Sequence, residues 1–237
     1  MTDQASSPVA NVPEPLADTA RLTRIATVLI WTWLATDVAL GLSALYTIGV
    51  LGGLGSAIAP AEPFAGLERV LAATGVLNAL AVAAAGIAVL RWIYRTSRNA
   101  HALGPAMTVT PGWAVGWFFV PVANLWKPFQ AVSETWQVSA DPRAPDAVPI
   151  PTVLRIWWGC WIASSIISNI DFRLSMQAES AEQLIAASWF TVAAVPVDIA
   201  LTIALATIMR RLSQMQCDRA GDLHQAPPQT LEDAVIE

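Results

Sequence analysis

The stretch PGWAVGWFFVPVANLWKPFQ, residues 111–130, is apolar enough to enter a membrane but has the wrong composition to cross one, with three prolines, three tryptophans, an asparagine and a lysine. Its apolar core, residues 112–126, would form a helix of about 22 Å, which is shorter than the roughly 30 Å of a bilayer's hydrocarbon. Pro121 and Pro128 each remove a backbone donor and disfavour helical geometry at the preceding residue. The stretch therefore predicts a helix that breaks before it can span.

Beyond Pro128 the sequence becomes amphipathic. Phe129, Val132 and Trp136 recur at the spacing of one helix face, with polar side chains between them. This pattern is typical of a helix that lies along the membrane interface. We therefore expect the whole segment 111–139 either to re-enter the membrane and turn back or to lie at its surface, and both alternatives stay open.

The rest of the chain has the composition of a membrane protein. Its 237 residues are 55% hydrophobic and 13% charged, with a mean hydropathy of +0.51. Long apolar runs, each close to the ~20 residues that span a bilayer as a helix, occupy residues 22–48, 67–92, 153–170 and 184–209. The predicted fold class is all-α: a polytopic membrane helical bundle of four transmembrane helices plus a broken re-entrant or interfacial helical segment.

Both ends of the sequence are polar. Residues 1–20 contain proline, serine and acidic residues and lack the basic start and apolar run of a secretory signal, and residues 212–237 are similarly polar. We expect both to be disordered tails that flank one integral membrane domain, residues 21–211.

The basic residues predict how the chain is oriented. If segment 111–139 returns to the side it came from, eleven of the 13 Lys and Arg residues lie on the side of the N-terminus, and only Arg69 and Arg173 lie opposite. If it crosses, the split becomes six against seven. Because positive charge is concentrated on the cytoplasmic side of membrane proteins, the first topology is strongly favoured, with both termini cytoplasmic.

The runs RWIYRTSRNAHALG (residues 91–104) and PGWAVGWFFVPVANLWKPFQAVSETW (residues 111–136) resemble the bacterial integral-membrane family catalogued as domain of unknown function 4328. The resemblance includes the Trp157–Trp158 pair and extends over roughly residues 20 to 210. The residues that carry it are Arg91, Trp92, Arg98, Asn99, Leu103, Gly104, Pro111, Gly112, Trp113, Gly116, Trp117, Pro121, Asn124, Trp126, Lys127 and Pro128. It implies a multi-pass protein of the bacterial inner membrane and assigns no activity, cofactor or catalytic residue.

Polar side chains occur within the predicted spans at similar depths. Asp37, Asn78, Ser164 and Asp198 each lie about 11 to 15 residues, or roughly 17 to 23 Å, from the inner end of their span. An unpaired charge there costs about 2.5–3.5 kcal/mol, so the carboxyls should face the bundle and find partners. We predict a midplane polar layer in which Asn78 and Ser164 or Ser165 donate to Asp37 and Asp198. Two protonated acids that serve only as packing contacts, and a proton or cation site, both stay open.

The cytoplasmic boundary is rich in arginine. Arg91, Arg95 and Arg98 recur at i, i+4 and i+7 where the second predicted helix leaves the membrane, and Arg155 opens the third. Anionic lipid headgroups are their expected partners, with a specific anionic ligand as the alternative.

Small residues also recur at one-turn spacing in the second predicted helix. Gly75, Ala79 and Ala83 are four residues apart. Such a stripe lets helix backbones approach closely in lipid and predicts a packing face.

No catalytic or cofactor motif is visible. The two histidines, His101 and His224, lie outside the predicted spans, and HExxH, CxxC and GxSxG motifs are lacking. We expect no catalytic residue, no metal and no cofactor. The net charge of −5 argues against a nucleic-acid partner.

Two functions stay open at this stage. The first is a non-catalytic membrane module whose aromatic and basic cytoplasmic face contacts anionic lipid and binds a protein partner or a second copy of the chain. The alternative is a small transporter or a proton or cation pathway that uses the polar layer around Asp37 and Asp198, since broken helices form binding sites in transporters.

Overall fold

The computed structural model describes residues 19–53 and 62–225, and this part of the chain is helical with no strand. The helices are α1 (Ala20–Gly53), α2 (Glu62–Leu103), α3 (Pro111–Gly116), α4 (Lys127–Ala140), α5 (Thr152–Met176) and α6 (Ala181–Gln225). Short 3-10 turns lie between α3 and α5, namely η1 (Trp117–Phe119), η2 (Ala123–Leu125) and η3 (Pro145–Ala147). The all-α prediction is confirmed for the described residues.

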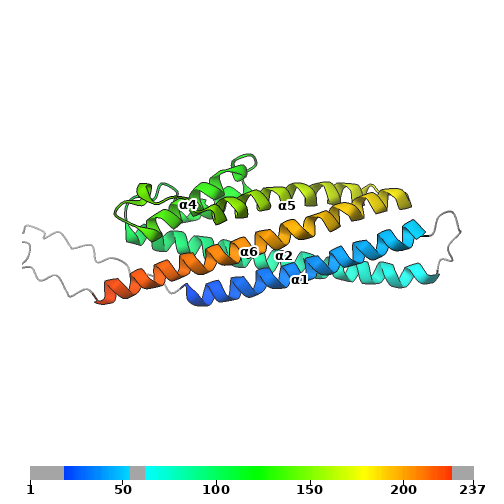
Figure 1. Cartoon of the computed structure of the whole chain (residues 1–237), viewed down its shortest axis with the longest axis horizontal. Coiled ribbons are helices and arrows are strands. Elements are labelled where there is room, and N and C mark those ends of the chain that lie inside the picture. The colour runs from blue at the N-terminus through cyan, green and yellow to red at the C-terminus, as the bar shows by residue number, and fades with distance from the viewer. Residues whose placement is uncertain (1–18, 54–61, 226–237) are drawn as a thin grey trace, which may run out of the picture.

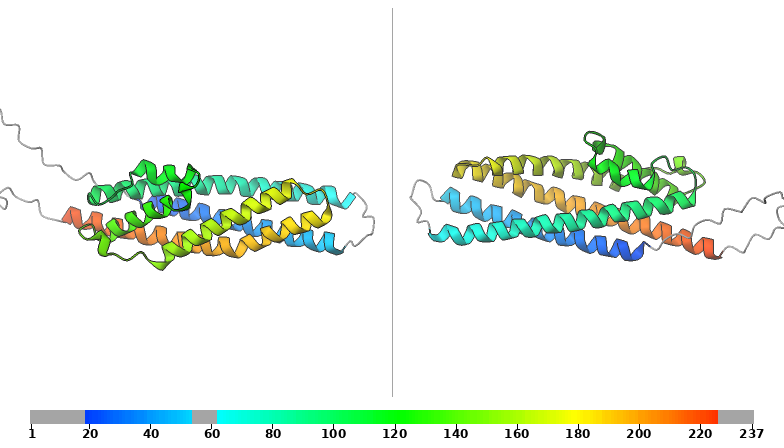
Figure 2. Two further views of the ribbon diagram at one scale, coloured as in Figure 1. Left: turned by 90° about the horizontal axis from the view of Figure 1, so that it is seen from above. Right: turned by 180° about the vertical axis from the view of Figure 1, so that it is seen from behind.

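Four long helices lie side by side in an antiparallel bundle (Figure 1, Figure 2). Helices α1 and α6 form its centre, since α1 packs against α2 and α6, while α6 packs against α1 and α5. Helices α2 and α5 thus lie at the outer sides. The segment from α3 to α4 covers α2, α5 and α6 at one end of the bundle.

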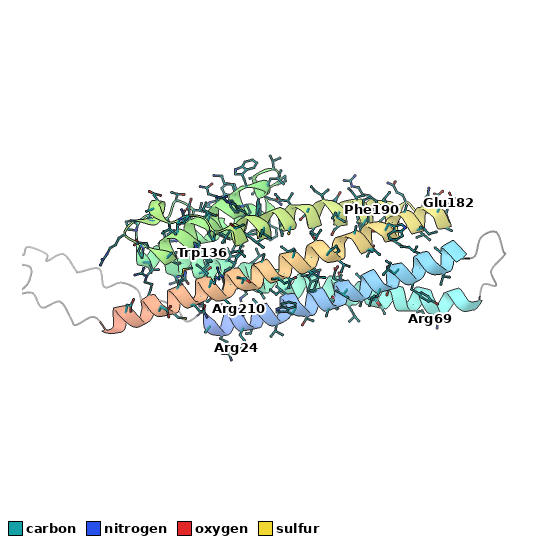
Figure 3. All side chains as sticks on the ribbon, in the orientation of Figure 1. Arg24, Arg69, Trp136, Glu182, Phe190 and Arg210 are labelled. Carbon is teal, nitrogen blue, oxygen red and sulfur yellow. The ribbon has the colours of Figure 1, made fainter. Side chains whose placement is uncertain are left out.

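The chain between α2 and α5 stays at that one end. The start of α1 and the end of α2 lie there, as do the start of α5 and the end of α6 (Figure 1). Figure 3 shows the same arrangement in the charges, with Arg24 and Arg210 toward this end and Arg69 and Glu182 toward the other. The segment α3–α4 therefore does not run the length of the bundle.

The exterior of the bundle is apolar. Three helical stretches are long and apolar enough to cross a membrane: α1, residues 72–103 of α2, and residues 181–222 of α6. In the most apolar 18 residues of each stretch, only 22%, 11% and 44% of the residues, respectively, are buried inside the protein. A water-soluble bundle buries its most apolar side chains, whereas these side chains face outward, which is compatible with a membrane.

Helix α5 is not among these three candidate spans. It is 25 residues long, but tryptophans and serines dilute its apolar residues, and Arg155, Asp171 and Arg173 lie near its ends. Four spans were predicted from the sequence, and three are supported by length and composition alone.

The helices extend beyond the predicted spans. Helix α2 runs to Leu103, and α6 continues past Met209 to Gln225. The prediction of a disordered tail from residue 212 is therefore wrong for residues 212–225. The reason is burial, since Leu212, Ser213 and Gln216 face other helices and are almost fully covered. Residues 1–18, which make up most of the predicted N-terminal tail, and residues 226–237, the last part of the predicted C-terminal tail, lie outside the described residues.

The segment 111–139 is broken as its prolines predicted. Helix α3 ends at Gly116, the backbone is extended at Val120, and Val122 has a φ of 68°. Pro128 opens α4, where a missing N–H is harmless. Eight of the 14 residues of α4 are buried, and α4 packs against α2 and α6. Helix α4 thus fills a gap at the end of the bundle, and the expectation that the segment re-enters the membrane or lies along its interface stays a prediction.

The sequence placed the close approach of helices at Gly75, Ala79 and Ala83 of α2, and this prediction is wrong for the packing within the chain. Ala79 and Ala83 are exposed, and a Cβ added to Gly75 would meet nothing within 4 Å. Instead, a Cβ on Gly41 of α1 would lie 2.6 Å from Cγ2 of Val195 on α6. The absence of a side chain at Gly41 therefore allows α1 and α6 to pack tightly at mid-bundle.

Gly41→Ala should destabilise the bundle by about 1–3 kcal/mol, because the stiff valine opposite cannot easily move away. Thermal unfolding of the purified protein in mild detergent measures this. Gly49→Ala is the matched control on the same helix, since a Cβ at Gly49 meets nothing within 4 Å. The control should be neutral or slightly stabilising. Equal behaviour of the two variants would show that α1 and α6 are not closely packed at Gly41.

Candidate functional site

The two mid-bundle carboxyls lie on the adjacent central helices α1 and α6. Asp198 is 2% exposed, and the buried Ser164 of α5 lies close to its carboxyl. Asp37 is half-buried, and its carboxyl is near enough to Asp198 for the two to repel each other when both are charged. The fold thus places groups from α1, α5 and α6 at one level of the bundle.

This polar layer is incompletely satisfied. Oδ2 of Asp37 and Oδ1 of Asp198 are buried without a hydrogen-bond partner among the described residues, and so is Oγ1 of Thr202. Thr202 is fully buried one turn beyond Asp198, and sequence reasoning missed it. Buried oxygens without donors can take up a proton or surround a small cation. No cluster of three or more His, Cys, Asp or Glu side chains that could hold a metal ion occurs in the described residues.

Two predicted members of the layer make other contacts. Nδ2 of Asn78 donates to Oγ1 of Thr36 at 3.2 Å, so Asn78 reaches α1 beside Asp37 but not the carboxyl itself. Ser165 is exposed, and its hydroxyl donates to the carbonyl of Trp161 on its own helix at 2.7 Å. Residue spacing along the sequence gave the depth of these side chains but not the direction each one faces.

An apolar cavity of about 370 Å³ lies between α2 and α5, in contact with the polar layer. Phe118 and Phe119 of η1 line it at the motif segment, and Ser164 and Ser165 line it on α5. Its other lining residues are Ile30, Trp33, Val82, Ala85, Gly86, Val89, Leu90, Trp157, Trp161, Leu201 and Leu205. Ser164 therefore connects this cavity to Asp198.

A second polar cluster, missed by sequence reasoning, lies at the end of the bundle that the segment from α3 to α4 covers. We call this the motif end, because it carries most of the residues of the family resemblance. Nε1 of Trp92 donates to Oγ1 of Thr23 at 3.0 Å and is 3.3 Å from Oγ of Ser213. The two hydroxyls also bond to each other. All three side chains are buried, so this cluster joins α1, α2 and α6 by hydrogen bonds shielded from solvent.

Gln216 extends the cluster to α4. Its Oε1 accepts from Nδ2 of Asn99 at 3.0 Å, and its Nε2 donates to the Thr96 carbonyl at 2.9 Å and to Oγ of Ser139 at 3.0 Å. Trp92, Thr96 and Asn99 follow each other at i, i+4 and i+7 on the buried face of α2. Two of these three, Trp92 and Asn99, are motif residues with a visible structural role.

The arginines of this helix each directly precede one of these three residues, so they lie on a neighbouring face of α2, about 100° around the helix axis. Arg91 and Arg98 are exposed and Arg95 is half-buried. Arg155, grouped with them as an expected lipid contact, is exposed on α5 instead. The four arginines therefore do not form a single surface.

Aromatic contacts shape the motif segment from α3 to η2. The rings of Trp113 and Trp117 stack with centroids 4.5 Å apart, and Nζ of Lys127 lies 5.8 Å above the Trp117 ring. A Cβ on Gly116 would come within 3.2 Å of the Trp113 ring, so glycine makes room for this stack.

Hydrogen bonds fix the turn of this segment. Nδ2 of Asn124 donates to the Phe118 carbonyl at 3.3 Å, across the turn that contains Pro121. Nε1 of Trp158 on α5 donates to the Leu125 carbonyl at 3.0 Å. Trp158 in turn stacks on Trp161, with centroids 4.7 Å apart. Trp158 of the Trp157–Trp158 pair therefore anchors the broken segment to α5.

The connection from α2 into the segment is held by one carboxylate that the sequence did not single out. Glu134 of α4 accepts from the backbone N–H of Thr108 and of Val109 and from the Thr108 hydroxyl, at 2.6 to 3.2 Å. Gly104 packs next to Pro142, and Pro111 opens α3. The loop between α2 and α3 is thereby tied to α4.

Despite these anchors, the segment leaves large apolar side chains uncovered. Phe119 and Val122 are 72% and 68% exposed. The motif tip, as we name this group of about half-exposed or more exposed side chains, comprises Trp113, Phe119, Val122, Leu125 and Trp126. The backbone that carries it, between α2 and α4, protrudes from the side of the bundle (Figure 1). A rigid, exposed apolar surface is typical of a contact with lipid or protein.

Comparison with known protein families matches residues 57–214 to the family described as domain of unknown function (DUF4328). The chain belongs to this family. The matched range runs from just before α2 into α6 and so includes the motif segment, Ser164 and Asp198 of the DUF4328 domain, whereas α1 with Asp37 precedes it. No curated protein and no solved structure matches the chain.

Proposed function

We propose that this DUF4328 protein is a non-catalytic module of the bacterial inner membrane that presents its motif tip to a protein partner or to a second copy of the chain. The observation that carries the proposal is the contrast within residues 111–126. Its backbone is held by Trp158 and Asn124, while Phe119 and Val122 remain largely uncovered. A preordered apolar surface binds with little loss of conformational entropy.

The proposed topology has four crossings, with α5 as the fourth. A helix of 25 residues is about 37 Å long, which is enough to span a bilayer, and α5 lies beside α6 in the bundle. Because α3–α4 stays at one end, the chain returns to its starting side before α5. Eleven of 13 basic residues then lie on the cytoplasmic side, together with both termini.

A second candidate function is a proton or cation pathway, and the unpaired oxygens of the polar layer favour it. If Asp37 and Asp198 served only as packing contacts, their carboxyls should pair with each other or with donors, yet each leaves one buried oxygen without a partner. A proton or a small cation would satisfy these oxygens.

Impermeant thiol labelling tests the topology. In a background with Cys160→Ser and Cys217→Ser, Asp146→Cys should resist labelling in intact spheroplasts and react after permeabilisation, because η3 would be cytoplasmic. Glu179→Cys, in the exposed turn between α5 and α6, should react in intact spheroplasts. Labelling of Asp146→Cys from outside would overturn the four-span topology.

Photo-crosslinking tests the motif tip. A photoreactive amino acid at Phe119 should give a reproducible protein adduct in the native membrane, identified by mass spectrometry as a partner or a second copy. The same amino acid at Leu80 of α2 is the control, since Leu80 is 63% exposed on the apolar exterior and should crosslink to lipid. If both positions gave lipid adducts alone, the tip would be a membrane contact and the proposal would fail.

Flux measurements test the second candidate. The purified protein in liposomes should carry a pH-dependent proton or cation flux, and Asp198→Asn should reduce it to the level of protein-free liposomes. Asp146→Asn, an exposed aspartate outside the bundle core, should leave the flux unchanged. An Asp198→Asn variant with undiminished flux would reduce the polar layer to a packing element.

A further inference from the structure

A large basic groove lies between α1 and α2 at the motif end, separate from the motif tip and from the polar layer. Its volume is about 970 Å³, and α3 closes one side of it. Its lining includes Arg21 from α1 and Arg91, Arg95 and Arg98 from α2, and none of the described residues that line it is acidic. The fold thereby adds a basic residue from another helix to the arginines that the α2 sequence places on one face.

The positive charge of this groove is largely uncompensated by the protein. Within the described part of the chain, Arg21, Arg91 and Arg95 form no ion pair or hydrogen bond. Arg21 and Arg91 are exposed, while Arg95 is half-buried. Guanidinium groups gathered in this way repel one another unless an anion lies between them.

The polarity of the groove changes along the bundle. The hydrogen bond from Trp92 to Thr23 places these two residues at the same level on α2 and α1. Compared with that level, Arg21, Arg95 and Arg98 lie closer to the end of the bundle. Ile25, Ile87 and Leu90 lie closer to its middle. The groove is therefore cationic at its outer end and apolar at its inner end.

We infer that this groove is a binding site for an anionic phospholipid of the cytoplasmic leaflet. The phosphate would lie between the guanidinium groups of α1 and α2, which can bind phosphate oxygens in a bidentate manner. The acyl chains would lie along Ile25, Ile87 and Leu90. Tyr94 lines the groove among the arginines, at the depth where an aromatic ring with a polar tip is favoured.

The charge and the shape of the groove together distinguish this ligand from other anions. A free phosphate would use only the arginine end and would leave the apolar end empty. A diffuse attraction of anionic lipid to the whole cytoplasmic surface would use exposed Arg155 and Arg211 as well, although neither lines the groove. The site therefore predicts that arginines of equal charge contribute unequally.

The test compares two double variants of the full chain that lose the same charge. Arg91→Gln with Arg95→Gln removes groove arginines, whereas Arg155→Gln with Arg211→Gln removes arginines elsewhere on the same side. Thermal unfolding in neutral detergent is measured with added dioleoylphosphatidylglycerol, dioleoylphosphatidylcholine or sodium phosphate. Phosphatidylglycerol should raise the unfolding temperature of the wild type and of the second variant, and its apparent affinity should fall roughly 30-fold in the groove variant, about 5-fold per arginine.

Three outcomes would overturn the inference. Equal losses in the two variants would indicate diffuse surface charge, stabilisation by sodium phosphate alone would indicate a free-anion site, and equal effects of the two lipids would exclude headgroup recognition. If the groove variant does not fold, a photoactivatable phosphatidylglycerol applied to the wild-type protein decides. Adducts should map to α1 and α2 around the groove, and adducts spread evenly over all the helices would reject the site.

Discussion

The hydrogen bonds of Gln216 hold the motif end of this bundle together. One amide joins α6 to α2 through Asn99 and the Thr96 carbonyl, and to α4 through Ser139. Because these groups are buried, losing one partner would leave others unsatisfied at a cost of about 1–3 kcal/mol each. This connection links the extension of α6 beyond Met209 to α2 and to the buried helix α4 that follows the broken segment.

The motif residues of the family divide between two tasks once they are placed in the fold. Trp92 and Asn99 bond to other helices on the inner face of α2, while Arg91 and Arg98 on its outer face line the basic groove. In the broken segment, Asn124 and Gly116 fix the course of the backbone, and this course leaves the aromatic side chains of the motif tip exposed. The same short part of the sequence thus provides the buried contacts that position these helices and the exposed surfaces, namely the basic groove and the motif tip.

Tight helix packing and buried charge occur close together in the centre of the bundle. Gly41 lies one turn from Asp37, and its neighbour Val195 lies three residues before Asp198. Close contact between α1 and α6 limits the room for water at the polar layer, so the unpaired carboxyl oxygens there depend on few nearby donors.

The sequence by itself determined the features that depend on composition and local chemistry. Long apolar runs predicted helices, Pro121 and Pro128 predicted a break, and the distribution of arginines favoured a return of the broken segment to the side it came from. The tertiary structure decided which side chains meet, because the facing of each helix depends on packing against neighbours distant in sequence. Periodicity could not show that Gly75 faces outward while Gly41 contacts Val195, that Thr202 joins the polar layer, or that Ser165 does not. It also gave no sign that residues 212–225 are helical, since polar residues such as Gln216 resemble a tail until α2 and α4 provide their partners.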